Sequence, residues 1–485
     1  MTKLLKTSLY ILTILLFTQC EGDLDTESHY NRDAYEDETI DPQFEDYGEN
    51  PFMKVKDAPI STFSVDADGG SYAVMRRYMS NGMMPNVASV RIEEYLNYFT
   101  FQYNDPTDGE HVALNSEMAV CPWNVKHHLL RLGIKGKTIP TNELPYSNFV
   151  FLIDVSGSMG GPDKLELLKS GFKLLADNLR DYDRIAIVTY AGTAHVLLES
   201  TDGENREKIK AAIDQLGTGG NTAGAAGIVK AYEIATENFI PGGNNRVILG
   251  TDGDFNVGIS SDEALVNLIE EKRESGIFLT ALGVGINNLN DRMMEKVANS
   301  GNGVYEYIDN PTQIEKVFVH EISKFYSVAQ DCKIQVKFNG EKVESYRLIG
   351  YENRALDDSD FKNDSVDAGE IGAGQTITAL YEVILKSNDK NEHYANFDVR
   401  YKKNINESSR LLQHSITNAP VEMNNASENM RFAATVAGFG MAMKQSKYKG
   451  SLNKRMILKL GNNAITYDPN GYRKELMSLI SEWKE

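Results

Sequence analysis

Short apolar runs alternate with helical periodicity through the middle of the chain, from residue 148 to about residue 325. The apolar runs predict buried strands, and apolar residues three and four positions apart predict amphipathic helices between them. The predicted strands cover residues 149–153, 184–190, 194–198, 246–250, 278–283 and 303–307, and the helices 163–180, 204–216, 223–238, 261–275, 289–299 and 311–326. This alternation predicts an α/β fold with a mostly parallel six-stranded sheet and helices on both faces. Residues 194–198 follow the preceding strand after a short turn, so we expect an antiparallel edge strand there.

The regions that flank this domain have other patterns. Residues 58–147 predict a short strand, two helices and then two strands within 111–135. Residues 328–420 predict a β-rich domain, which the strands of 111–135 could complete. Residues 421–485 have helical periodicity and predict a C-terminal helical region.

The first twenty residues have the pattern of a secretory signal. Lys3 and Lys6 precede an apolar run over residues 9–17, which is too short to span a bilayer. Cys20 follows directly, which predicts a lipoprotein signal peptide over residues 1–19 and lipid attachment at Cys20. The residues just before Cys20 depart from the usual small-residue pattern and resemble the looser lipoprotein signals of the Bacteroidetes group. Cleavage elsewhere, with a free Cys20, is the alternative.

Residues 20–57 are strongly acidic. Between residues 21 and 50 there are twelve acidic residues and one basic residue, Arg32, with few aliphatic side chains. Such a segment cannot bury enough apolar surface to fold, so it predicts a disordered tether. The acids directly after Cys20 also resemble a surface-export signal. We therefore expect an anchor in the outer membrane, on its periplasmic face or at the cell surface, although a plain solvated linker is the alternative reading of these acids.

Charge and cysteine content exclude several classes of protein. Fifty basic against sixty-nine acidic residues give a net charge of −19, which opposes binding to nucleic acid or to anionic lipid headgroups. Three cysteines cannot form a disulfide-dense scaffold or a four-cysteine zinc site. Cys121 and Cys332 lie in the two flanking β segments, and export would permit a disulfide between them. Two buried free thiols are the alternative.

Three loops carry oxygen ligands at the ends of predicted strands. Asp154, Ser156 and Ser158 follow strand 149–153, Thr222 precedes a helix, and Asp252 follows strand 246–250. Ligands bind at the carboxyl ends of strands in open α/β sheets, and carboxylate and hydroxyl oxygens suit hard divalent cations. The sequence therefore predicts a metal site formed by these five residues. Asp254 lies close to it and could support the ligands from behind, or could simply cap its loop.

These loops resemble the metal-ion-dependent adhesion site of von Willebrand factor type A (VWA) domains. Asp154, Ser156 and Ser158 match Asp-x-Ser-x-Ser, Thr222 matches Gly-Gly-x-Thr, and Asp252 matches Thr-Asp-Gly. The resemblance implies a Rossmann-like VWA domain over residues 148–327, bound Mg²⁺, Mn²⁺ or Ca²⁺, and protein recognition. Further motifs are similar to bacterial YfbK-type VWA lipoproteins and extend the resemblance to about residues 58–485: 61–66, 90–94, 122–124, 251–258, 347–354 and 368–374.

Together these features indicate a lipid-anchored envelope protein that binds a protein partner through a metal. An Asp or Glu carboxylate of the partner would complete the coordination of the ion, so we expect a binding protein and not an enzyme. Two alternatives stay open. One is a metal-independent scaffold or assembly factor. The other is a metal-dependent hydrolase, for which Asp254 is the nearby candidate general base, since His195 is predicted on an edge strand.

Overall fold

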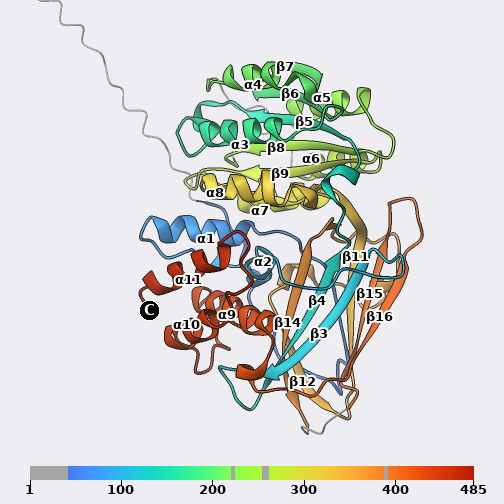
Figure 1. Cartoon of the computed structure of the whole chain (residues 1–485), viewed down its shortest axis with the longest axis vertical. Coiled ribbons are helices and arrows are strands. Elements are labelled where there is room, and N and C mark those ends of the chain that lie inside the picture. Colours follow the sequence, from blue (N-terminus) through green and yellow to red (C-terminus); the bar gives the residue numbers. More distant parts are fainter. Residues whose placement is uncertain (1–41, 220–223, 254–261, 387–391) are drawn as a thin grey trace, which may run out of the picture. The chain divides into compact units, whose positions relative to one another are not determined.

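The computed structural model describes residues 42–219, 224–253, 262–386 and 392–485 (Figure 1). The signal peptide, Cys20 and most of the acidic tether lie outside the described residues, as do Thr222 and Asp254 of the predicted metal site. In the part of the chain that is described, no helix is both long and apolar enough to cross a membrane.

The central segment forms the predicted α/β domain. In the described residues its sheet has six strands in the order β10-β9-β8-β5-β6-β7. Their bounds are Ser147–Asp154 for β5, Arg184–Ala191 for β6, Thr193–Asp202 for β7, Asn244–Thr251 for β8, Ile277–Gly283 for β9 and Tyr305–Tyr307 for β10. Neighbouring strands are parallel except β6 and β7, which pair antiparallel around Gly192. The predicted fold class is confirmed, including the antiparallel edge strand.

Helices cover both faces of this sheet. Alternate residues of a strand point to opposite faces, so successive residues of β5 pack against different helices. Phe151 of β5 faces α3 (Leu165–Asp177), where its ring stacks on Phe172 with centroids 4.3 Å apart. The next residue, Leu152, lies in the opposite cluster with Ile228. That cluster includes side chains of α5 (Gly224–Glu237), α6 (Asp262–Arg273) and α7 (Asp291–Ser300). The helices α4 (Arg206–Asp214) and α8 (Pro311–Glu315) pack against α3.

The flanking β segments form two antiparallel sheets in the described residues, with orders β1-β12-β14-β4-β3 and β13-β11-β15-β16, and β2 also pairs with β11. The bounds are Met53–Lys54 for β1, Ile60–Ser64 for β2, Val112–Val120 for β3, His128–Gly136 for β4, Ser327–Phe338 for β11, Val343–Ile349 for β12, Ile371–Gly372 for β13, Thr376–Leu385 for β14, Ala395–Lys402 for β15 and Arg410–Ile416 for β16. β4 pairs with β14 along nearly its whole length. Strands from both sides of the α/β domain therefore share one sheet, and that domain is inserted in sequence between β4 and β11.

Five helices pack around one apolar cluster beside these sheets. They are α1 (Gly70–Ser80), α2 (Ile92–Asn97), α9 (Glu428–Met443), α10 (Lys454–Asn462) and α11 (Tyr472–Glu482). Phe99 and Phe432 meet edge to face in this cluster, with ring centroids 5.0 Å apart. Gly440 lets α9 approach α2 closely, since a Cβ there would lie 3.2 Å from the side chain of Ile92. Segments from the two ends of the described chain thus share a core (Figure 1).

Cys121 and Cys332 are both buried free thiols. Cys121 belongs to the helical cluster at the end of β3, whereas Cys332 lies in β11, in the other sheet, and packs in a different cluster. Burial raises the pKa of each thiol, which keeps it in the less reactive protonated form. The structure therefore contradicts the disulfide and favours the alternative of two separate thiols, because the two cysteines pack in different apolar clusters.

Candidate metal centre

The carboxyl ends of β5 and β8 form the edge on which the predicted ligands lie. These strands are parallel neighbours, so their ends meet at the same side of the sheet. Asp154 is the last residue of β5, and Ser156 and Ser158 lie in the turn that follows it. Asp252 comes directly after the end of β8. The structure thus brings the first and third sequence motifs together, and we call this region the metal edge.

Short-range hydrogen bonds hold the oxygen atoms of the metal edge. The amide of Ser156 donates to Oδ1 of Asp154 over 2.9 Å, and the hydroxyl of Thr251 donates to Oδ2 over 3.1 Å. The Oγ atoms of Ser156 and Ser158 lie 3.0 Å apart. Asp154 and Asp252 are both 0% exposed. Two buried carboxylates and two hydroxyls therefore converge from two strand ends.

The electrostatics of the metal edge fit a divalent cation. Burial raises the pKa of Asp154 to about 6, and the neighbouring charge of Asp252 raises it as well, while hydrogen bonds from Ser156 and Thr251 lower it. Two buried like charges are unfavourable unless a cation offsets them. Two carboxylates with neutral hydroxyl oxygens are the hard donor set that Mg²⁺, Mn²⁺ and Ca²⁺ accept, and no thiolate is included in it. The described residues therefore fit the ion that the sequence predicts.

Two residues that the sequence analysis missed also contact the metal edge. The ammonium of Lys164 donates to Oδ2 of Asp252 over 3.0 Å and to the carbonyl oxygen of Ser158 over 2.7 Å. The side-chain amide of Asn288 donates to the same Oδ2 of Asp252 over 2.8 Å. Asn288 follows β9, whose carboxyl end adjoins that of β8, so the rule that led to Asp252 could have pointed to it. Lys164 has no comparable signal, because it lies just before a helix.

The remaining candidates are less directly placed. Thr222 and Asp254 lie outside the described residues. The amide of Gly219 donates to the carbonyl oxygen of Val155 over 2.8 Å, so the segment that leads to Thr222 begins at the metal edge. His195 lies on the edge strand β7 with an exposed side chain.

A buried acidic cluster joins the α/β domain to the rest of the chain. Carboxylate oxygens of Asp66, Glu94 and Glu295 all lie within 4.8 Å of one another. Arg354 donates through Nε to Asp66 over 2.8 Å and pairs with Glu295 at 3.4 Å. Arg91 pairs with Glu94 through its Nε, as Arg354 does with Asp66. We call these five residues, with Asp291, the arginine network. Its guanidinium groups already provide cationic partners for the three carboxylates.

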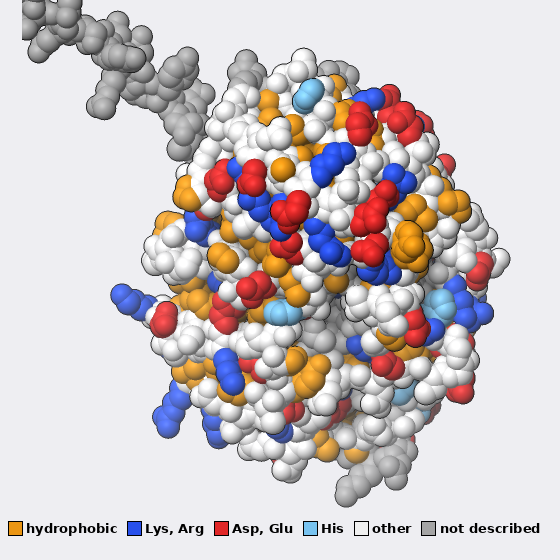
Figure 2. Space-filling view, turned by 45° about the horizontal axis from the view of Figure 1, so that its top comes forward, with side chains coloured by type: hydrophobic (Ala, Val, Ile, Leu, Met, Phe, Trp, Pro, Cys, Tyr) orange, Lys and Arg blue, Asp and Glu red, His pale blue; other side chains and the backbone are white. Residues whose placement is uncertain are grey.

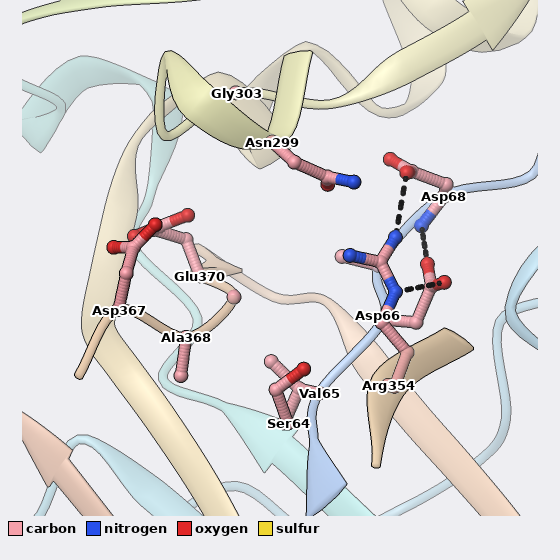
Figure 3. Close-up of a pocket in the computed structure, with 12 residues that line it drawn as sticks. Ser64, Val65, Asp66, Asp68, Asn299, Gly303, Arg354, Asp367, Ala368 and Glu370 are labelled. Carbon is pink, nitrogen blue, oxygen red and sulfur yellow. Dashed lines mark hydrogen bonds and ion pairs between the residues drawn. The ribbon is translucent and has the colours of Figure 1, made fainter. Parts of the chain in front are cut away.

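Three of the motifs that resemble YfbK-type proteins meet at this network. A cavity of about 100 Å³ is lined by residues from segments 61–66, 347–354 and 368–374. Figure 3 shows Arg354 on one side of this cavity, bonded to Asp66 and Asp68, with Glu370 on the other. These motifs therefore build the junction between the α/β domain and the sheets that flank it.

Glu93 adjoins the network and makes the stability of the fold depend on pH. It is 1% exposed, and burial, with the charges of Glu352 and Asp66, raises its pKa from 4.5 to about 8. Between these values the folded chain holds a proton that the unfolded chain has lost, so the free energy of unfolding falls as the pH rises. We expect Glu93→Gln to remove this part of the slope and to be more stable than wild type at pH 9 by up to about 5 kcal/mol. Urea unfolding between pH 5 and 9 measures it.

Glu344→Gln is the matched control, because Glu344 is exposed on β12. It should follow the wild-type pH dependence. The assignment to Glu93 is wrong if Glu93→Gln also follows it.

Comparison with known proteins gives the class of this chain and then its family. The family model described as von Willebrand factor type A domain matches residues 148–320, which agrees with the sheet order and the strand-end loops described above. This is therefore a VWA protein. A second model, described as von Willebrand factor, matches residues 38–131, and a third, described as the C-terminal region of uncharacterized protein YfbK, matches residues 323–485.

Uncharacterized protein YfbK of Escherichia coli is 40% identical to this chain over 465 residues, which cover 90% of this chain and 80% of that protein. The chain belongs to the YfbK family. Among solved structures, a von Willebrand factor type A protein from Catenulispora acidiphila is 16% identical, with a TM-score of 0.44 over 78% of this chain and 91% of that one. An aerotolerance-related membrane protein from Bacteroides fragilis is 24% identical, with a TM-score of 0.31 over 37% of this chain and 99% of that one.

Proposed function

We propose that this chain is a cell-envelope lipoprotein that binds a protein partner through a divalent cation at the metal edge. Asp154, Ser156, Ser158 and Asp252 would hold the cation together with Thr222. The observation that carries the proposal is the convergence of two fully buried aspartates with two hydroxyls 3.0 Å apart. Membership of a VWA family supports a protein-interaction module as the setting for this site.

The residues of the metal edge suit recognition of a carboxylate. When bound, Mg²⁺, Mn²⁺ or Ca²⁺ supplies a Lewis-acidic position that an Asp or Glu side chain of the partner can occupy. The chain contributes two carboxylates and leaves the remaining donors neutral, which preserves the attraction for an incoming anion. Asp154 must be ionised to hold a cation, and its pKa is raised to about 6. Metal affinity should therefore fall as the pH drops below this value.

The proposed anchor is a lipid on Cys20, followed by the acidic tether. It rests on the order of the sequence features: two lysines, a short apolar run and a cysteine. The tether would hold the described domains away from an outer-membrane surface. Mass spectrometry of the mature N-terminus tests this part, and an unmodified Cys20 would remove it.

Calorimetric titration of Mg²⁺, Mn²⁺ and Ca²⁺ into the full chain is the first experiment. Saturable binding is the expected result, and affinity capture from envelope extract should then give a partner that EDTA releases and Mg²⁺ restores. Well-folded protein that binds none of the three cations would show the proposal to be wrong.

A metal-independent scaffold is the second candidate, and Lys164 is the observation that favours it. Its ammonium already neutralises Asp252 in part without any bound ion. Under this alternative the same partner would be captured in EDTA, and also by a double variant with Ser156→Ala and Ser158→Ala.

A further inference from the structure

Lys164 provides a fixed positive charge beside the metal edge. Its ammonium donates to Oδ2 of Asp252, to the carbonyl oxygen of Ser158 and, over 3.1 Å, to Oδ1 of Asn288. A lysine ammonium has three N–H donors, so these three contacts use all of them. The side chain is 15% exposed. Lys164 is therefore an ordered internal cation and not a mobile surface charge.

The chain is shaped around the stem of this lysine. Gly285 has a φ of +65°, and a Cβ at this position would lie 2.4 Å from Cε of Lys164. Only glycine accepts both the backbone conformation and the close approach. The loop after β9 thus holds Lys164 from one side, while its Asn288 holds the ammonium itself.

The contacts of Lys164 are compatible with a metal ion at the predicted ligands. They go to one oxygen of Asp252 and to a main-chain oxygen of Ser158, so the ammonium uses neither the carboxylate of Asp154 nor a serine hydroxyl. Ammonium and metal ion can be present together. Two aspartates balance a divalent ion alone, and with Lys164 the loaded metal edge keeps one net positive charge.

We propose that Lys164 determines the specificity of the metal edge: it weakens cation binding and strengthens binding of a carboxylate to the loaded site. The first effect is repulsion between two neighbouring cations, and the second is attraction of an anion by the added positive charge. This inference rests on the proposed function, because it requires a metal at the metal edge. It adds that the chain's own lysine, and not the metal alone, makes the loaded site prefer a carboxylate to a neutral oxygen ligand.

Two titrations of the full chain test the proposal with Lys164→Gln. Mn²⁺ binding is measured by calorimetry, and binding of N-acetylaspartate to the Mn²⁺-loaded protein is followed by water-proton relaxation. We expect Lys164→Gln to bind Mn²⁺ about tenfold more tightly and N-acetylaspartate about fivefold more weakly. Lys164→Arg keeps the charge and should stay near wild type in both. Lys169→Gln is the matched control, because Lys169 has a similar exposure of 12% but pairs with Glu166 on α3.

The possible results distinguish failure of the role of Lys164 from failure of the proposed function. Opposite shifts in Lys164→Gln alone support the proposal. Two results would overturn the role of Lys164 and leave the proposed function standing, provided that the wild type binds Mn²⁺. In one, both affinities of Lys164→Gln equal those of the wild type. In the other, Lys164→Gln folds but no longer binds Mn²⁺. Wild-type protein that binds neither Mn²⁺ nor Mg²⁺ nor Ca²⁺ overturns the proposed function itself. If Lys164→Gln does not fold, N-acetylaspartate binding to the Mn²⁺-loaded wild type is measured at increasing ionic strength instead. Attraction by a site of net positive charge must weaken as the ionic strength rises. An affinity that stays constant overturns the proposal.

Discussion

Replacing Arg91 by methionine is expected to lower the free energy of unfolding by about 3–5 kcal/mol, because removing one partner of a buried ion pair leaves its other charges uncompensated. Arg91 is 3% exposed, and its Nη1 lies 2.6 Å from Oδ2 of Asp291. Its Nε pairs with Glu94, which is 0% exposed. Methionine fills a similar volume but supplies no cation, so Glu94 and Asp291 would stay buried without this partner.

Equilibrium unfolding in urea, followed by circular dichroism, measures this loss. The matched control is Arg184→Met, which breaks the pair between Arg184 and Asp202 on exposed positions of the VWA sheet, with side chains 38% and 46% exposed. Such pairs contribute about 1 kcal/mol or less. Adding Asp291→Asn to Arg91→Met should restore part of the stability. Equal midpoints for Arg91→Met and Arg184→Met would show that the arginine network does not stabilise the fold as described.

The inner strands of the VWA sheet were predictable because they are buried on both faces. An inner strand of this kind contains an apolar run next to an amphipathic helix, and this contrast is strong in a sequence. The edge strand β7 was also placed correctly, since a turn of one or two residues can only join antiparallel neighbours. By contrast, β16 lies at the end of a sheet and its residues are mostly exposed or half-buried. A strand with so little apolar contrast has almost no periodic signal.

The candidate site was predictable only where its residues are adjacent to strand ends. Asp154 and Asp252 follow their strands directly, and parallel pairing brings them to one edge. The arginine network depends instead on tertiary contacts: Arg91 and Asp291 are 200 positions apart, and Arg354 and Asp66 are 288 apart. A single sequence offers no way to pair such residues. Lys164 was missed for the same reason, because its role depends on the loop of β9 folding back over it.

The metal edge and the arginine network share one segment of chain. The loop that carries Asn288 leads within three residues to Asp291, the first residue of α7. Asn288 contacts the metal edge, and Asp291 is bound by Arg91 from outside the VWA sheet. Asn290 between them caps α7 by accepting a hydrogen bond from the amide of Met293. One loop and the helix start that follows it therefore contact both the metal edge and the arginine network.

Asp154→Asn is expected to raise the stability of the metal-free protein and to weaken its binding of metal. Without metal, the neutral amide removes the cost of a buried carboxylate whose pKa is raised to about 6 beside Asp252. The variant should therefore be more stable than wild type at pH 8 in EDTA, by about 1–3 kcal/mol. Its amide also fits the existing bonds, since Oδ1 can still accept from Ser156 and the hydroxyl of Thr251 can accept instead of donate.

With metal, the same change removes one of the two carboxylates and should weaken Mg²⁺ and Mn²⁺ binding at least about a hundredfold, because hard cations depend on charged oxygen ligands. Thermal unfolding in EDTA and calorimetric titration give the two readouts on one preparation. Asp163→Asn is the control: Asp163 is 37% exposed and pairs with Arg77, so neither quantity should move beyond the small effect of a surface pair. If Asp154→Asn gains stability but keeps its metal affinity, the buried charge of Asp154 does not serve metal binding. If the variant loses both stability and metal affinity, the hydrogen bonds of Asp154, and not its charge, organise the metal edge.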